Sequence, residues 1–171
     1  RRSPTDQPRA EEAGADAVKF QKRSLKDLYR KDVLERIDDQ ENSLHYLVGH
    51  ITRAELSEEA MTDLHRYAAD QGVDFIATPW DAPSLHFLER LNLPAFKVGS
   101  PDMFNLPLLK EMVRLKRPLI ISTGMSYMSE IELLIDFLNK TRARYILLHC
   151  NSTYPCPVHD INLRFLRELQ A

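Results

Sequence analysis

The sequence is poor in the features that mark several large classes of protein. Its 171 residues include two cysteines, Cys150 and Cys156, which are too few for a disulfide scaffold. No apolar run approaches the roughly 20 residues of a membrane-spanning helix. The formal net charge is -2 at pH 7, which argues against a strongly basic surface for nucleic acid or membranes. We therefore expect a globular protein that binds neither nucleic acid nor membrane, with both cysteines as structural thiols.

Signals for secretion and for a metal centre are missing as well. Arg1-Arg2-Ser3-Pro4 leads into polar residues rather than the apolar core of a signal peptide. The low cysteine content fits a reducing compartment, so we expect a cytoplasmic protein. The six histidines include no His-x-x-x-His spacing, and a single pair of cysteines is a poor zinc motif. We predict no complete metal site, and we expect His149 to be a hydrogen-bonded residue at a strand end.

Five apolar runs stand out, and each ends in small polar or cationic residues. Continuous runs of this length predict strands buried on both faces, which is typical of a parallel sheet. The expected strands are Ala17–Gln21, Val73–Ala77, Ala95–Val98, Leu119–Ser122 and Arg144–His149.

Helical patterns separate these strands. The expected helices run from Ser57 to Gln71, Asp81 to Leu91, Asn105 to Lys116, Ser129 to Lys140, and from Asp160 onward. The alternation predicts βαβ crossovers. A complete (β/α)₈ barrel needs about 250 residues, so the chain is either an open sheet or part of a barrel.

Two segments do not follow this alternation. Residues 1–12 are polar, and we expect a frayed or disordered lead-in. Residues 22–54 contain no clear strand and are expected to form one or two short helices. Such an insertion is either a substrate lid or a surface excursion without a role, and the residues favour neither.

Polar residues at the carboxyl ends of parallel strands meet where such folds place their chemistry. Lys19 and Lys97 lie in apolar strands, where a cation needs a partner or an anionic ligand. Thr78 and Ser122 are hydroxyl donors at neighbouring strand ends, and Ser122-Thr123-Gly124 is typical of a small anion nest. Together they predict a site for an anionic, phosphorylated small molecule.

Four motifs in order carry a more specific resemblance. They are Gly14-Ala15-Asp16-Ala17-Val18-Lys19-Phe20-Gln21, Phe96-Lys97-Val98-Gly99-Ser100, Ile121-Ser122-Thr123-Gly124-Met125 and His149-Cys150-Asn151-Ser152-Thr153-Tyr154-Pro155. The set strongly resembles the N-acetylneuraminate (sialic acid) synthase family, whose relatives include pseudaminic and legionaminic acid synthases and spore-coat polysaccharide synthases. The resemblance extends from about residue 13 to residue 171.

This resemblance implies a metal-dependent (β/α)₈ TIM barrel that forms a carbon–carbon bond. The enzyme would be a transferase of carbohydrate biosynthesis that condenses phosphoenolpyruvate with an N-acetylated amino sugar, such as N-acetylmannosamine, and releases phosphate. It implies a divalent metal, Mn or Mg, and a homodimer for the full-length form. Residues 13–171 would be an incomplete barrel domain of five strands, without the metal ligands and therefore inactive as a fragment.

The resemblance also implies roles for individual residues. Lys19, Lys97, Ser100 and Ser152 would bind phosphoenolpyruvate, and Gln21 and Tyr154 would contact the sugar. Asp102 would be the catalytic acid, although Pro101-Asp102 stands where the family has Gly followed by an acidic residue.

Two alternatives stay open. Lys97, desolvated on a strand, could form a Schiff base in an aldolase. Otherwise the chain would be a non-catalytic truncated barrel that binds an anion or a partner chain through its open sheet edges.

Overall fold

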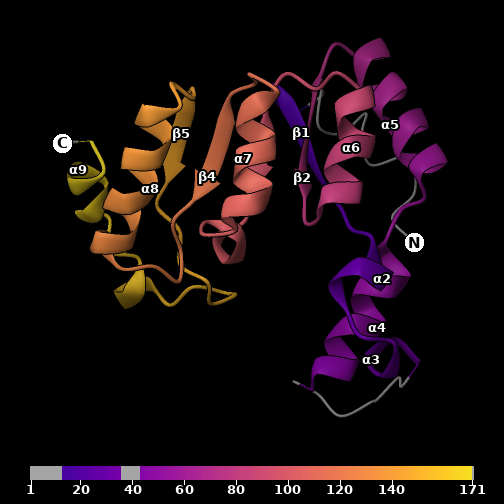
Figure 1. Ribbon diagram of the computed structural model, residues 1–171, viewed down its shortest axis with the longest axis horizontal. Helices are drawn as coiled ribbons and strands as arrows, with labels where there is room; N and C mark the ends of the chain where they lie inside the picture. Colours follow the sequence, from indigo (N-terminus) through magenta and orange to yellow (C-terminus); the bar gives the residue numbers. More distant parts are fainter. Residues whose placement is uncertain (1–12, 36–42, 171) are drawn as a thin grey trace. The chain divides into compact units, whose positions relative to one another are not determined.

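The computed structural model describes residues 13–35 and 43–170, which fall into two compact units divided between Leu93 and Pro94 (Figure 1). Each unit combines parallel strands with helices. Residues 1–12, for which a frayed lead-in is expected, lie outside the described residues.

Unit 1 is built on two parallel strands, β1 (Ala17–Lys22) and β2 (Asp74–Pro79). They pair in register, with Ala17 opposite Asp74 and Lys22 opposite Pro79. One face of this ladder is apolar: Phe20 and Phe75 stack at 4.8 Å between ring centroids, and His65 meets Phe75 edge-on. Helices α5 (Glu58–Asp70) and α6 (Ala82–Arg90) pack against β2.

Between β1 and α5 lies an excursion whose described residues, 23–35 and 43–57, form three helices, where the sequence suggested one or two short ones. These are α2 (Leu25–Leu28), α3 (Lys31–Glu35) and α4 (Leu44–Ala54). Ser43 caps α4, because its Oγ accepts a hydrogen bond from Tyr46 N at 3.0 Å. Neither α2 nor α3 has a buried residue, so short-range hydrogen bonds and neighbouring helices stabilise the excursion.

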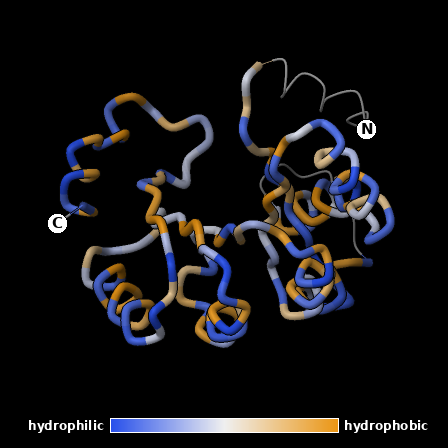
Figure 2. Tube along the Cα trace, turned by 90° about the horizontal axis from the view of Figure 1, so that it is seen from above, coloured by the Kyte–Doolittle hydropathy of each residue, from blue (hydrophilic) through white to orange (hydrophobic). Residues whose placement is uncertain are grey.

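Unit 2 contains three parallel strands, β3 (Phe96–Val98), β4 (Leu119–Ser122) and β5 (Tyr145–Leu148). Phe96 pairs with Leu119, which pairs in turn with Tyr145. A 3₁₀ turn, η2 (Ser100–Asp102), and α7 (Leu106–Arg114) connect β3 to β4, and α8 (Met128–Lys140) connects β4 to β5. Apolar residues of α7 and α8 complete this core: Leu108, Leu109, Met112, Ile131, Leu134 and Leu138. Figure 2 shows orange and blue residues side by side around the helices, as expected when one face is buried.

The fold is a partial (β/α)₈ TIM barrel, with five parallel strands alternating with helices. In unit 1 β1 pairs with β2, and in unit 2 β4 pairs with both β3 and β5. All of β3 is buried, as expected of a strand covered on both faces. In β1 exposure alternates along most of the strand, and β5 is only partly buried, so for these two the expected burial on both faces was wrong.

Two helix boundaries differ from the expected ones. Helix α8 begins at Met128 rather than after a Ser129 cap, because the Glu130 carboxylate accepts from Tyr127 N at 2.8 Å and turns the chain there. The single helix expected from Asp160 is instead a 3₁₀ turn, η3 (Val158–Asp160), followed by α9 (Phe165–Glu168). Asn162, with φ of 52°, separates them, because a left-handed residue interrupts helical hydrogen bonding.

No helix in the described part of the chain has both the length and the hydrophobicity to span a membrane.

Candidate functional site

The face of the unit 1 ladder opposite Phe20 and Phe75 carries the polar residues singled out from the sequence. Lys19 and Gln21 alternate with the apolar residues of β1, and Thr78 is the register partner of Gln21 on β2. Thr78 lies inside β2 and is buried, whereas Lys19 and Gln21 are exposed. The unit therefore places these three side chains on one face.

The surroundings of Lys19 perturb its titration. Its pKa is lowered below the usual 10.5, first because surrounding atoms desolvate the ammonium and second because Arg23 adds a like charge nearby. Lys19 and Arg23 thus make this face electropositive, which suits an anionic ligand.

Gln21 is held by two neighbours that sequence reasoning missed. Trp80 Nε1 donates to Gln21 Oε1 at 3.0 Å, and Arg23 donates to the same oxygen. The Arg23 guanidinium also lies 4.3 Å from the centroid of the Trp80 ring, which is cation–π geometry. We call Gln21, Arg23 and Trp80 the Gln21 triad.

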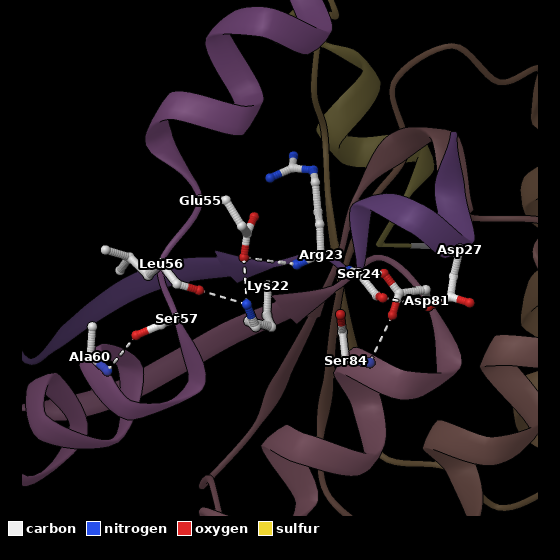
Figure 3. Close-up of polar contacts among 10 residues, drawn as sticks. All are labelled: Lys22, Arg23, Ser24, Asp27, Glu55, Leu56, Ser57, Ala60, Asp81 and Ser84. Carbon is white, nitrogen blue, oxygen red and sulfur yellow. Dashed lines mark hydrogen bonds and ion pairs between the residues drawn. The ribbon is translucent and has the colours of Figure 1, made fainter. Parts of the chain in front are cut away.

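A buried ion pair closes the base of the excursion where β1 ends (Figure 3). Lys22 Nζ donates to Glu55 Oε1 at 2.8 Å and to the Leu56 carbonyl at 2.6 Å. The same carboxylate oxygen accepts from Arg23 N at 3.2 Å. Because Glu55 follows α4 directly, this pair brings the two ends of the excursion together.

Asp81 makes a second connection at this end of unit 1 (Figure 3). One carboxylate oxygen accepts from Ser24 N at 2.7 Å, and the other caps α6 by accepting from Ser84 N at 2.7 Å. The chain leaving β1 is thereby bound to the start of α6, and the Gln21 triad lies beside a fixed piece of backbone.

In unit 2 the second predicted lysine is buried and faces hydroxyl groups. Lys97 is 9% exposed, and its Nζ donates to the Val98 carbonyl at 2.6 Å and to Ser122 Oγ at 2.5 Å. Since Lys97 pairs with Ile120, Ser122 is two residues further along the same face of β4. Cys150 Sγ also contacts Ser122 Oγ, at 3.2 Å.

Two more predicted hydroxyls gather around Gly124. A Cβ at this position would lie 2.7 Å from Ser152 Oγ, 2.9 Å from Ser100 Oγ and 3.1 Å from the Cys150 carbonyl. Only glycine lets both hydroxyls approach the backbone this closely. Unit 2 therefore brings together Lys97, Ser100, Ser122 and Ser152, which we call the hydroxyl cluster.

Thr123 and His149 serve the framework of unit 2. Thr123 N and Oγ1 both donate to the Leu148 carbonyl at 3.0 Å, so the hydroxyl pair expected from Ser122-Thr123 does not act as a pair. His149 Nε2 lies 2.6 Å from the Ile161 carbonyl, which requires the proton on Nε2. The expectation of a hydrogen-bonded histidine at this strand end is confirmed.

Asp102 and Tyr154 are the remaining predicted residues of unit 2. Asp102 Oδ1 accepts from Asn105 Nδ2 at 3.1 Å and so supports the residue that caps α7. Tyr154 is 91% exposed, so its side chain lies in solvent. The catalytic role of Asp102 and the sugar contact of Tyr154 stay predictions.

The residues that sequence reasoning missed are Lys22, Arg23, Glu55, Trp80, Asp81 and Cys150. Lys22 could have been noticed, because it follows apolar residues at the end of a predicted strand. A lysine that is buried there needs an acidic partner. Its partner, Glu55, lies 33 residues away, so the sequence offered no means of pairing them.

A family model described as the NeuB family matches residues 8–171. The chain is 36% identical over 162 residues to N-acetylneuraminate-9-phosphate synthase of Homo sapiens, covering 94% of this chain and 45% of the human protein. It is also 36% identical over 170 residues to N,N'-diacetyllegionaminic acid synthase of Legionella pneumophila, covering 94% of this chain and 47% of that protein. The chain therefore spans about half the length of these relatives.

The fold has solved counterparts. The crystal structure of the N-acetylneuraminic acid (sialic acid) synthetase from Leptospira borgpetersenii, in complex with citrate, matches with a TM-score of 0.83 and 28% identity. The match covers 98% of this chain and 54% of that one. The resemblance that the four motifs suggested is thereby confirmed.

Proposed function

Because the chain belongs to the NeuB family, we propose that it carries the phosphoenolpyruvate-binding part of a sialic-acid-type synthase. The enzyme would be a transferase that condenses phosphoenolpyruvate with an N-acetylated amino sugar. The enol carbon attacks the aldehyde carbon of the open sugar and forms the new carbon–carbon bond. Water then adds to the neighbouring, phosphate-bearing carbon, and a proton from this water ends on the oxygen of the former aldehyde. Phosphate leaves with cleavage of the bond between that carbon and the bridging oxygen, and the added hydroxyl loses its proton to give the ketone.

The observation that carries this proposal is the hydroxyl cluster of unit 2. Lys97 supplies a buried positive charge, and Ser122 lies within 2.5 Å of its Nζ. Ser122 Oγ has two neighbours that can donate to it, Lys97 and Cys150, so its own proton is available for a ligand oxygen. Ser100 and Ser152 add hydroxyls over Gly124. A cation with several hydroxyl donors complements a phosphate or carboxylate.

In unit 1 we assign Lys19 and Thr78 to phosphoenolpyruvate binding and Gln21 to the sugar. The lowered pKa of Lys19 supports this, because a desolvated cation gains most from an anionic partner. Tyr154 and Asp102 complete the assignment as the sugar contact and the catalytic acid. The protein would be cytoplasmic and, at full length, a homodimer.

The metal implied by the family does not fit the described residues. No group of three or more His, Cys, Asp or Glu side chains that could hold an ion occurs within residues 13–35 and 43–170. The Mn or Mg expected for the full-length enzyme would need ligands outside this set, and the residues assigned above act by binding and orienting the substrates. We therefore expect little or no turnover from residues 1–171 assayed alone.

Titration calorimetry with phosphoenolpyruvate tests the proposal. Lys97→Ala is expected to weaken binding by at least 10-fold, or about 1.4 kcal/mol, because a charge-assisted contact is lost. Ser122→Ala is the second variant, in case Lys97→Ala does not fold. Lys110→Ala, on the exposed side of α7, is the matched control and should bind as the unmodified chain does. Equal binding by all three would remove the hydroxyl cluster from the site.

The same samples separate the alternatives. Borohydride reduction in the presence of pyruvate would leave a covalent adduct on Lys97 if the protein were a Schiff-base aldolase. Binding of an anion without any response to an amino sugar would favour a non-catalytic truncated barrel.

A further inference from the structure

The side-chain amide of Gln21 faces two groups that can only donate hydrogen bonds. Trp80 Nε1 approaches Gln21 Oε1 at 3.0 Å, and the Arg23 guanidinium donates to the same oxygen. Neither an indole nor a guanidinium has an acceptor. Rotating the amide by half a turn would point its NH₂ group at two other N–H groups, so the pair selects one orientation.

That orientation determines what Gln21 can offer to a ligand. Both acceptor sites of Oε1 are taken by Trp80 and Arg23, and the NH₂ group is directed away from them. Gln21 is exposed, so this NH₂ group can be reached from solvent. A glutamine normally offers a donor and an acceptor, but in the Gln21 triad it offers donors alone.

The charges around the triad act in the same direction. Lys19 lies two residues before Gln21 on the same face of β1, and Arg23 follows two residues after it. The pKa of Lys19 is lowered partly by the charge on Arg23, which places the two cations within electrostatic reach of each other. A ligand group bound here therefore meets N–H donors and positive charge.

We propose that Trp80 and Arg23 are positioning residues that fix the Gln21 amide with its NH₂ group outward, so that this subsite accepts an oxygen acceptor of the sugar and rejects a protonated amine. The proposal rests on the function proposed above, in which Gln21 contacts the sugar. It makes the Gln21 triad a determinant of selectivity for N-acylated over de-acylated amino sugars. An acyl carbonyl or a hydroxyl can accept from the amide, whereas an ammonium can only donate and is repelled.

Orientation of the amide can be tested without any ligand. Trp80 is the single tryptophan of the chain, so its indole N–H gives one identifiable signal in a ¹H–¹⁵N spectrum. Gln21→Ala should shift this signal and speed its exchange with water, because the indole loses its acceptor. Asn139→Ala, which removes the acceptor of the Tyr145 hydroxyl in unit 2, is the control and should leave the indole signal unchanged.

Selectivity is tested by titrating the chain with N-acetylmannosamine and with mannosamine and following the same spectrum. The unmodified chain should prefer the N-acetylated sugar. Trp80→Phe keeps an aromatic ring under Arg23 but removes the indole donor, and it should reduce this preference by about 10-fold while phosphoenolpyruvate binding is retained. Gln21→Glu keeps an acceptor for Trp80 and Arg23 but has no outward donor, and it should reverse the preference. Arg23→Leu, which removes the guanidinium donors, is the second variant if Trp80→Phe is not folded.

Each outcome bears on one proposal. An indole signal that does not change in Gln21→Ala, or a preference that is unchanged in both Trp80→Phe and Arg23→Leu, overturns the positioning role. Binding of phosphoenolpyruvate with no preference between the two sugars overturns the selectivity and leaves the proposed acid site standing. Failure to bind either sugar also overturns the selectivity, and a simultaneous failure to bind phosphoenolpyruvate overturns the proposed function.

Discussion

Each unit contains a buried lysine in a strand, Lys22 in β1 and Lys97 in β3. The groups that accept hydrogen bonds from each lysine indicate whether it stabilises the fold or is a candidate for binding a ligand. Lys22 and Lys97 are 8% and 9% exposed, so burial does not distinguish them. Lys22 donates to the carboxylate of Glu55, which neutralises its charge in place. Lys97 donates to a serine hydroxyl that can turn and donate in its own right to a ligand. The serine hydroxyl beside Lys97, rather than the depth of burial, is therefore what makes Lys97 our candidate for binding an anion.

Breaking the Lys22–Glu55 pair should have the largest effect on stability. Glu55→Ala removes the carboxylate that accepts from Lys22 Nζ and leaves the Leu56 carbonyl to accept from this buried ammonium. Removing one partner of a buried pair costs about 3 kcal/mol. Urea unfolding followed by circular dichroism measures the loss. Asp136→Ala, which breaks the exposed Lys140–Asp136 pair, should cost less than about 0.5 kcal/mol. Equal losses in both variants would contradict a structural role for Lys22.

The hydroxyl cluster should respond in binding more than in stability. In Gly124→Ala the new methyl would lie 2.7 Å from Ser152 Oγ and 3.1 Å from the Cys150 carbonyl, so the hydroxyls must move. We expect a loss of about 10-fold in phosphoenolpyruvate affinity, measured by calorimetry. The destabilisation should be about 1 kcal/mol, in the range of ordinary substitutions.

A second substitution separates crowding from the loss of a contact. Gly124→Ala combined with Ser152→Ala removes the shortest clash and should recover stability, but it should not recover affinity, because a ligand donor has gone. Full recovery of both would show that Ser152 only fills space.

The two cysteines provide a smaller and closely matched comparison. Cys150 Sγ contacts Ser122 Oγ at 3.2 Å, whereas Cys156 Sγ contacts the Pro157 carbonyl at 3.4 Å. Cys150→Ala should weaken phosphoenolpyruvate binding about 3-fold, because a weak donor that helps to orient Ser122 is lost. Cys156→Ala should have no effect on calorimetric affinity. An effect from Cys156 alone would move the site away from Ser122.

The smallest expected effect is on the titration of Lys19. Arg23→Gln removes a like charge and should raise the pKa of Lys19 only part of the way towards 10.5, because desolvation is the larger cause. Reductive methylation of the lysines, followed by NMR across pH, measures it. If Arg23→Gln leaves the Lys19 titration unchanged, the two side chains are not coupled.

The sign of the pH dependence follows from the depressed pKa. The folded state disfavours the charged form of Lys19, so at neutral pH this lysine lowers the free energy of unfolding. Between the folded-state pKa and the usual 10.5, the unfolded chain keeps the proton that the folded protein has lost. The free energy of unfolding therefore rises with pH in that window. Because Lys19 is exposed, solvent screening keeps the contribution small.

Most of the sheet could be predicted because its signals are local. Leu119–Ser122 was predicted to the residue, and helix α5 begins after Ser57, as its capping serine and acidic first turn indicated. The end of the chain was harder. Asn162 adopts a left-handed conformation that nothing nearby in the sequence announces, and it divides what read as one helix.

The candidate site divides in a similar way. Lys97, Ser122 and Ser152 were recognised from residue type, strand position and resemblance, and unit 2 brings Ser122 into contact with Lys97 and with Cys150. Arg23 and Trp80 were not predicted as site residues, because an arginine or a tryptophan after a strand is common. Their role becomes visible only in the structure, where both donate to Gln21 Oε1. The meeting depends on the register that sets Gln21 opposite Thr78, two residues before Trp80.

By itself the sequence determined the family, the alternation of strands and helices and the residue types at the strand ends, because these depend on short-range periodicity and on motifs read in order. Tertiary structure alone decided that Lys22 donates to Glu55 and Lys97 to Ser122, and which way the Gln21 amide points. Those outcomes depend on hydrogen bonds between residues as far as 59 positions apart, such as Trp80 to Gln21. Partners at such separations are chosen by the packing of strands and helices in three dimensions, which no local pattern encodes.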